Sequence, residues 1–150
     1  MLSCSDTLSA LRLLLLATFV VGTAGTSVEL VLIEHYEELW QLAPLLLMLA
    51  SLLVLAWYGV ARSAAAVWAF RGVLALFVVA AGVGIVLHYQ GNVEFELERA
   101  PSLGGLALVW EALRGATPAL APGTMLQLAL VGLAWSFRHP ALDGRTGVRA

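Results

Sequence analysis

Residues 28–40 (VELVLIEHYEELW) separate two long apolar runs and determine how the rest of the chain is interpreted. This stretch holds four of the ten acidic residues and one of the three histidines. Residues 87–99 (LHYQGNVEFELER) follow the third apolar run and have the same character, a His-Tyr pair together with several glutamates. We therefore expect the apolar runs to form a scaffold that positions these two polar stretches.

The composition favours a lipid bilayer as the solvent of this chain. Of its 150 residues, 61% are hydrophobic and 12% are charged, whereas soluble domains have about 25% charged residues. The apolar runs are long and continuous, unlike the alternating segments of about ten residues in a membrane β-barrel. At about 20 residues per span, the sequence predicts an all-α integral membrane protein, a bundle of four transmembrane helices.

Polar and helix-breaking residues set the limits of the four predicted spans. An uncleaved first span is favoured over a signal peptide, because Asp6 weakens the positive start and apolar sequence resumes at Val28. Pro44 is expected in the first turn of the second span, where its missing N–H costs nothing. A tight connection is expected at Arg62. The predicted spans are residues 11–33, 42–60, 65–87 and 120–138.

Residues 88–119 form the one long loop of this arrangement. Residues 93–98 alternate between apolar and acidic with period two, which predicts an extended segment. Residues 103–114 fit a short helix capped by Ser102, too short to span a bilayer and therefore expected at the membrane interface. Arg–carboxylate pairs are expected to hold the loop together as a lid. The polar residues of this lid are Asn92, Arg99, Glu111 and Arg114.

The distribution of arginine predicts the orientation. With the N-terminus inside, six arginines and two aspartates fall on the inner face, and two arginines and eight glutamates fall on the outer face. The charges are +4 (6 − 2) inside and −6 (2 − 8) outside, in agreement with the positive-inside rule. Both termini are thus expected in the cytoplasm. The arrangement resembles small four-span bacterial inner-membrane proteins in general, which implies a multi-pass protein of that membrane.

Two histidines are expected at the same membrane depth, because the first and third spans run in the same direction. With nearby glutamates they are candidates to bind Zn, Cu, Mn or Fe, or to be the axial ligands of a haem. A first helix extending to Trp40 would bring two of these glutamates together. Their spacing matches no established signature, and ordinary interfacial residues are the alternative. The candidate ligands are His35, His88, Glu34, Glu38 and Glu94.

Glu29 is a separate candidate, because an ionisable residue inside a span normally faces the bundle interior or water. In that case the chain would be a small transporter or channel subunit in which Glu29 titrates or binds a cation. Alternatively, the span ends near Ser27 and Glu29 is interfacial. At the inner end of the last span, His139 is expected to be a cation near the negative end of the helix dipole.

Other function classes find little support. No nucleophile–base pair, phosphate-binding loop or dinucleotide fingerprint is present, and a net charge of −2 without a basic stripe argues against nucleic acid. The single Cys4 excludes an internal disulfide. The sequence therefore predicts a non-enzymatic accessory or interaction subunit of a membrane complex, with an acidic extracytoplasmic cap as its working surface. Its expected partners are the lipid bilayer and a membrane protein or a second copy.

Overall fold

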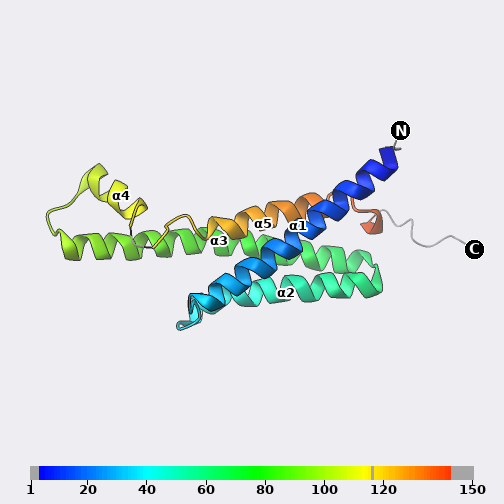
Figure 1. Cartoon of the computed structure of the whole chain (residues 1–150), viewed down its shortest axis with the longest axis horizontal. Helices are drawn as coiled ribbons and strands as arrows, with labels where there is room; N and C mark the ends of the chain where they lie inside the picture. The colour runs from blue at the N-terminus through cyan, green and yellow to red at the C-terminus, as the bar shows by residue number, and fades with distance from the viewer. Residues whose placement is uncertain (1–3, 116, 143–150) are drawn as a thin grey trace, which may run out of the picture. The chain divides into compact units, whose positions relative to one another are not determined.

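The computed structural model describes residues 4–115 and 117–142, which contain helices and no strand. They form two compact units, the first over Met1–Phe77 and Gln127–Ala150 and the second over Val78–Leu126. The predicted all-helical class is confirmed. The helices (Figure 1) are α1 Cys4–Leu32, α2 Leu39–Ala61, α3 Ala64–Arg99, α4 Gly105–Leu113 and α5 Gly123–Ser136, followed by a 3-10 turn at Pro140–Leu142.

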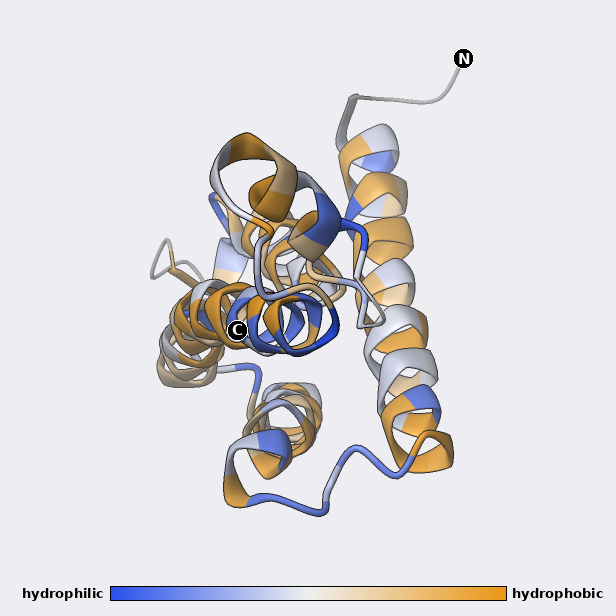
Figure 2. Cartoon of the chain, turned by 90° about the vertical axis from the view of Figure 1, so that its left-hand side faces the viewer, coloured by the Kyte–Doolittle hydropathy of each residue, from blue (hydrophilic) through white to orange (hydrophobic). Residues whose placement is uncertain are grey.

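Three helices are long and apolar enough to cross a membrane. They are α2, α3 and the part of α1 from Ser5 to Leu32. They overlap the first three predicted spans, although α3 continues to Arg99, beyond the predicted end at residue 87, and they indicate a membrane protein. Their outward faces are apolar: on α1, the exposed fractions of Leu13, Val21 and Leu32 are 68%, 72% and 76%. Figure 2 shows α1 apolar along most of its length and the connection to α2 hydrophilic. The helix in the predicted fourth span, α5, has 14 residues, fewer than the roughly 20 that a full crossing needs.

Aromatic side chains form the core of the first unit. The rings of Phe19 on α1 and Phe70 on α3 meet edge to face with centroids 5.1 Å apart. Trp135 on α5 meets Phe70 in the same manner at 5.5 Å. Such edge-to-face pairs add stability beyond the area that they bury. One aromatic cluster therefore joins α1, α3 and α5.

Two glycines allow α5 to lie directly against its neighbours. A Cβ atom at Gly132 would lie 2.8 Å from Cδ1 of Leu74 on α3, and one at Gly22 on α1 would lie 2.8 Å from Cδ2 of Leu128. Small residues permit such close approach of helices in membrane proteins. From Gln127 onward, α5 is therefore a packed part of the first unit.

The second helix begins earlier than predicted. The backbone N–H of Glu38 donates to Oε1 of Gln41 at 3.1 Å, and this contact caps a helix that starts at Leu39. Pro44 is consequently the sixth residue of α2, so the prediction that it lies in the first turn is wrong. The tight connection after α2 is confirmed. Arg62 takes the left-handed conformation with φ 48°, and its N–H donates to the carbonyl of Tyr58 at 2.8 Å.

The long loop is largely helical. Residues 93–98, predicted to be extended, belong to α3, which continues to Arg99. Glutamate, leucine and arginine favour helix, and Oε2 of Glu96 lies 3.3 Å from Nη2 of Arg99 one turn later. This contact is an ion pair without hydrogen-bond geometry, since the same oxygen has no hydrogen-bond partner. The predicted interfacial helix begins at Gly105 with Gly104 as its cap rather than Ser102.

Candidate functional site

The connection between α1 and α2 contains three of the predicted metal ligands. The N–H of His35 donates to the Leu30 carbonyl at 2.8 Å, and the N–H of Glu34 donates to the Val31 carbonyl at 3.1 Å. With Glu34 at φ 58°, this is a Schellman end of the helix. This motif ends α1 at Leu32, close to the predicted end of the first span at residue 33. The helix through Trp40 that would have brought Glu34 and Glu38 together does not form. The side chains of Glu34 and Glu38 are exposed.

The other predicted ligands, His88 and Glu94, lie in the second unit. Nδ1 of His88 is 3.3 Å from the carbonyl oxygen of Pro118, and the Glu94 side chain is exposed. Among residues 4–115 and 117–142, no three His, Cys, Asp or Glu side chains come together as a metal-binding group. His35 belongs to the first unit and His88 to the second, so a metal or haem site that both share stays a prediction.

Glu29 lies within α1, one turn before its end, and its side chain is exposed. No part of the chain that the structure describes encloses this carboxylate. A transport role in which Glu29 faces a path between subunits stays a prediction.

In the second unit, Asn92 on α3 binds the last turn of α4 and the residues that follow it. Its Nδ2 donates to the carbonyls of Ala112 at 2.9 Å and Thr117 at 2.6 Å. Its Oδ1 accepts from the N–H of Thr117 at 3.2 Å and from the Thr117 hydroxyl at 2.6 Å. The side chain is 1% exposed, and all four of its hydrogen-bonding positions are used. We call this set of contacts the Asn92 clasp.

The contacts of Asn92 differ from the Arg–carboxylate pairs that were predicted to hold the lid together. Arg–carboxylate pairs were expected to connect its segments, but Arg99 pairs with Glu96 on its own helix. The guanidinium carbon of Arg114 lies 5.8 Å from the Trp110 ring centroid, within α4 and its cap. A neutral amide therefore makes the long-range connection.

Four arginines gather at one end of the first unit, and we call them the arginine cluster: Arg12, Arg62, Arg71 and Arg138. Nη2 of Arg12 donates to the Arg138 carbonyl at 2.9 Å. Arg71 donates from Nη2 to the Ser136 carbonyl at 2.6 Å and from Nε to the Ser136 hydroxyl at 3.1 Å. Carbonyls at helix C-termini lack partners within the helix and attract cations.

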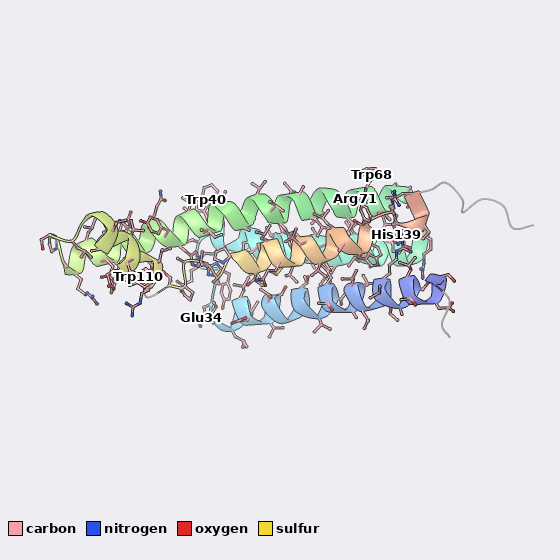
Figure 3. The ribbon with its side chains drawn as sticks, turned by 90° about the horizontal axis from the view of Figure 1, so that it is seen from above. Glu34, Trp40, Trp68, Arg71, Trp110 and His139 are labelled. Carbon is pink, nitrogen blue, oxygen red and sulfur yellow. The ribbon has the colours of Figure 1, made fainter. Side chains whose placement is uncertain are left out.

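His139 is buried among these arginines. Its ring lies 5.1 Å from that of Tyr58 and 4.7 Å from that of Trp135, between centroids. Nδ1 accepts the backbone N–H of Ala141 at 3.2 Å, so that nitrogen carries no proton. Figure 3 shows Arg71, Trp68 and His139 at one end of the first unit and Glu34 and Trp40 at the other.

The surroundings lower the pKa of His139 below its ordinary value of 6.5, first through burial and then through the charges of Arg12, Arg71 and Arg62. The imidazole is therefore neutral at pH 7, and the prediction of a cation at the helix end is wrong. Burial and like charges both disfavour the protonated ring. His139 follows the end of α5 at Ser136, so no helical spacing in the sequence indicated that its ring meets that of Trp135.

No family model, curated protein or solved structure matches this chain.

Proposed function

We propose that this chain is a non-enzymatic accessory subunit of a membrane complex, which docks on a membrane-protein partner through a helical arm. The α3–α4 arm consists of residues 88–115. The observation behind this proposal is the length of α3, which has 36 residues. At about 1.5 Å per residue it measures roughly 54 Å, against about 30 Å of hydrocarbon in a bilayer. The excess is the polar end of α3, which extends beyond the lipid.

The surface of the arm is both acidic and apolar. Glu94 and Glu98 are exposed, as are Leu106, Trp110 and Phe95, with exposed fractions of 87%, 59% and 47%. Exposed aromatic and leucine side chains in a polar surrounding are typical of a protein interface. A partner with basic and apolar groups would complement this surface.

We further propose a four-crossing topology in the bacterial inner membrane, with both termini in the cytoplasm and α5, extended by the residues before it, as the fourth crossing. The arginine cluster supports this orientation, because arginines concentrate on the cytoplasmic side. Glu94→Cys in a Cys4→Ser background should react with a membrane-impermeant maleimide applied to intact cells. Labelling only after permeabilisation would contradict the topology.

Co-purification from native membranes in mild detergent tests the accessory role. Leu106→Gln should reduce the recovered partner about tenfold, since an apolar anchor in an interface contributes more than 1 kcal/mol. Leu39→Gln is the matched control, because Leu39 is 84% exposed and lies outside the arm. Repeated isolation of the wild type alone, or equal recovery with both variants, would count against the proposal.

A further inference from the structure

The charges of the arginine cluster are not matched by a carboxylate in the part of the chain that the structure describes. Within residues 4–115 and 117–142, none of its four guanidinium groups forms an ion pair with a carboxylate; the ion pair found there joins Arg99 and Glu96. Arg12 donates to the Arg138 carbonyl and Arg62 donates from Nε to the Gly59 carbonyl at 3.2 Å. Each guanidinium has five N–H groups, so donors remain for an anion.

Two members of the cluster stand at backbone positions that favour glycine. Arg62 has φ 48° and Arg138 has φ 44°. A left-handed conformation costs an L-residue about 1–2 kcal/mol, and glycine avoids this cost. Both positions follow the end of a helix, α2 and α5, where glycine is the usual residue, so each arginine stands there in place of a residue that would avoid this cost.

An apolar groove of about 350 Å³ leads to the cluster between α1 and α2. Leu16 and Val20 line it on α1, and Arg12 precedes Leu16 by four residues on the same helix face. On α2 the lining runs along one face and reaches Arg62 after Tyr58 and Gly59. Both helices therefore present an apolar stripe that ends at an arginine. The α2 lining residues are Leu52, Leu55, Ala56, Tyr58 and Gly59.

The length of the groove fits one leaflet of a bilayer. From Leu52 to Arg62 the helix rises about 15 Å, at about 1.5 Å per residue, which is half of the roughly 30 Å of hydrocarbon. Guanidinium groups are the preferred protein partners of phosphate, because their N–H groups match its oxygens in pairs. Tyr58, at the same end, has an apolar ring and a polar tip suited to the headgroup level.

We propose that the groove and the arginine cluster form a binding site for an anionic phospholipid. One acyl chain lies along α1 and α2, and the phosphate meets Arg12 and Arg62. This site is independent of the partner proposed for the α3–α4 arm.

The test measures lipid binding to the full chain in mild detergent by native mass spectrometry. The probes are dioleoyl phosphatidylglycerol, dioleoyl phosphatidylcholine with the same acyl chains, and inorganic phosphate. The anionic lipid should bind about tenfold more tightly than the zwitterionic one. Both lipids carry the same phosphate, but only phosphatidylcholine brings a choline cation next to the arginines, which repel it. Equal binding of the two lipids would overturn the proposal, as would displacement of the bound lipid by millimolar phosphate, which would assign the site to a soluble anion.

Two variants separate the headgroup from the groove. Arg62→Gln removes one of the two guanidinium groups that meet the phosphate and should reduce the preference for the anionic lipid. Arg114→Gln, outside the cluster, should leave this preference unchanged. Gly59→Leu should weaken both lipids, since a Cβ at Gly59 meets nothing within 4 Å and the added side chain can occupy the groove without disturbing the fold. If either Arg62→Gln or Gly59→Leu binds both lipids as the wild type does, the proposed site is refuted. Should Arg62→Gln fail to fold, Arg12→Gln is its substitute.

Discussion

Two places of this apolar chain that hold polar side chains are the arginine cluster of the first unit and the α3–α4 arm of the second. The two places differ in how their hydrogen-bonding groups and charges find partners. In the arm, the buried Asn92 amide meets four neutral partners and leaves no hydrogen-bonding position unused. In the cluster, cations rest on backbone carbonyls, and no described carboxylate neutralises them. A fully satisfied network fixes a fold, whereas an unbalanced charge favours a ligand. The comparison therefore assigns structure to the clasp and binding to the cluster.

Breaking the Asn92 clasp should have the largest effect. Asn92→Leu leaves the Ala112 carbonyl and the Thr117 backbone without their partner, and we expect the arm to lose about 3 kcal/mol. Hydrogen exchange of the α4 amides should then accelerate about 100-fold, while exchange in α1 and α2 stays at the wild-type rate. The reason is that the clasp joins segments of the second unit alone.

Gln90→Leu is the control for this change. Gln90 is exposed on the same helix, so the substitution removes an amide of the same kind without opening a buried network. Unaltered exchange in α4 is expected. If exchange of the α4 amides accelerates equally in both variants, the general polarity of α3 stabilises the arm, and the Asn92 clasp does not.

The apolar spans were predictable and the clasp was not, for a physical reason. A run of some 20 apolar residues has one stable environment, so α1, α2 and most of α3 follow from composition. The period-two pattern of residues 93–98 covers only six positions. Extending the helix that precedes them is easier than ending it, so these residues form the last part of α3. The partners of Asn92 lie 20 and 25 residues away in sequence, and no local pattern reports such a contact.

The candidate site shows the same division. The arginines were assigned to one membrane side by counting charges, and the structure places four of them at one end of the first unit. That His139 is neutral depends on packing against Tyr58 and Trp135. The sequence around His139 does not show that side chains from α2 and α5 bury its ring. The helix dipole considered alone therefore predicted a protonated ring.

Titration of His139 should give an intermediate effect and sharpen the description of the cluster. In the unfolded chain this histidine binds its proton with a pKa near 6.5, and in the folded chain with a lower pKa. Below pH 6.5 the unfolded state therefore binds more protons, and the free energy of unfolding falls as the pH decreases toward the folded pKa. Above pH 6.5 this contribution is constant. Thermal unfolding of the chain in detergent between pH 4.5 and 8 measures it (roughly the range in which histidine titrates).

Two variants identify the source of this pH dependence. His139→Phe keeps a ring against Tyr58 and should remove the decline below pH 6.5. Arg71→Gln removes one of the charges that lower the pKa of His139, so the decline should become smaller. A decline that persists unchanged in His139→Phe would assign it to carboxylates elsewhere in the chain.

The smallest effect concerns Glu34, which shares a left-handed backbone with Arg62 and Arg138 but stands at the opposite end of the first unit (Figure 3). If Glu34 only ends α1, Glu34→Gly should raise the free energy of unfolding by about 0.5–1 kcal/mol, because glycine takes this conformation without strain. If Glu34 is instead a metal ligand, millimolar Zn²⁺ should raise the unfolding temperature of the wild type and not of the variant, since a ligand stabilises only the state that binds it. Stabilisation by glycine with no response to Zn²⁺ in either protein would leave Glu34 as a helix terminator. The arginine cluster would then be the one strained end of the unit whose side chains are retained for binding.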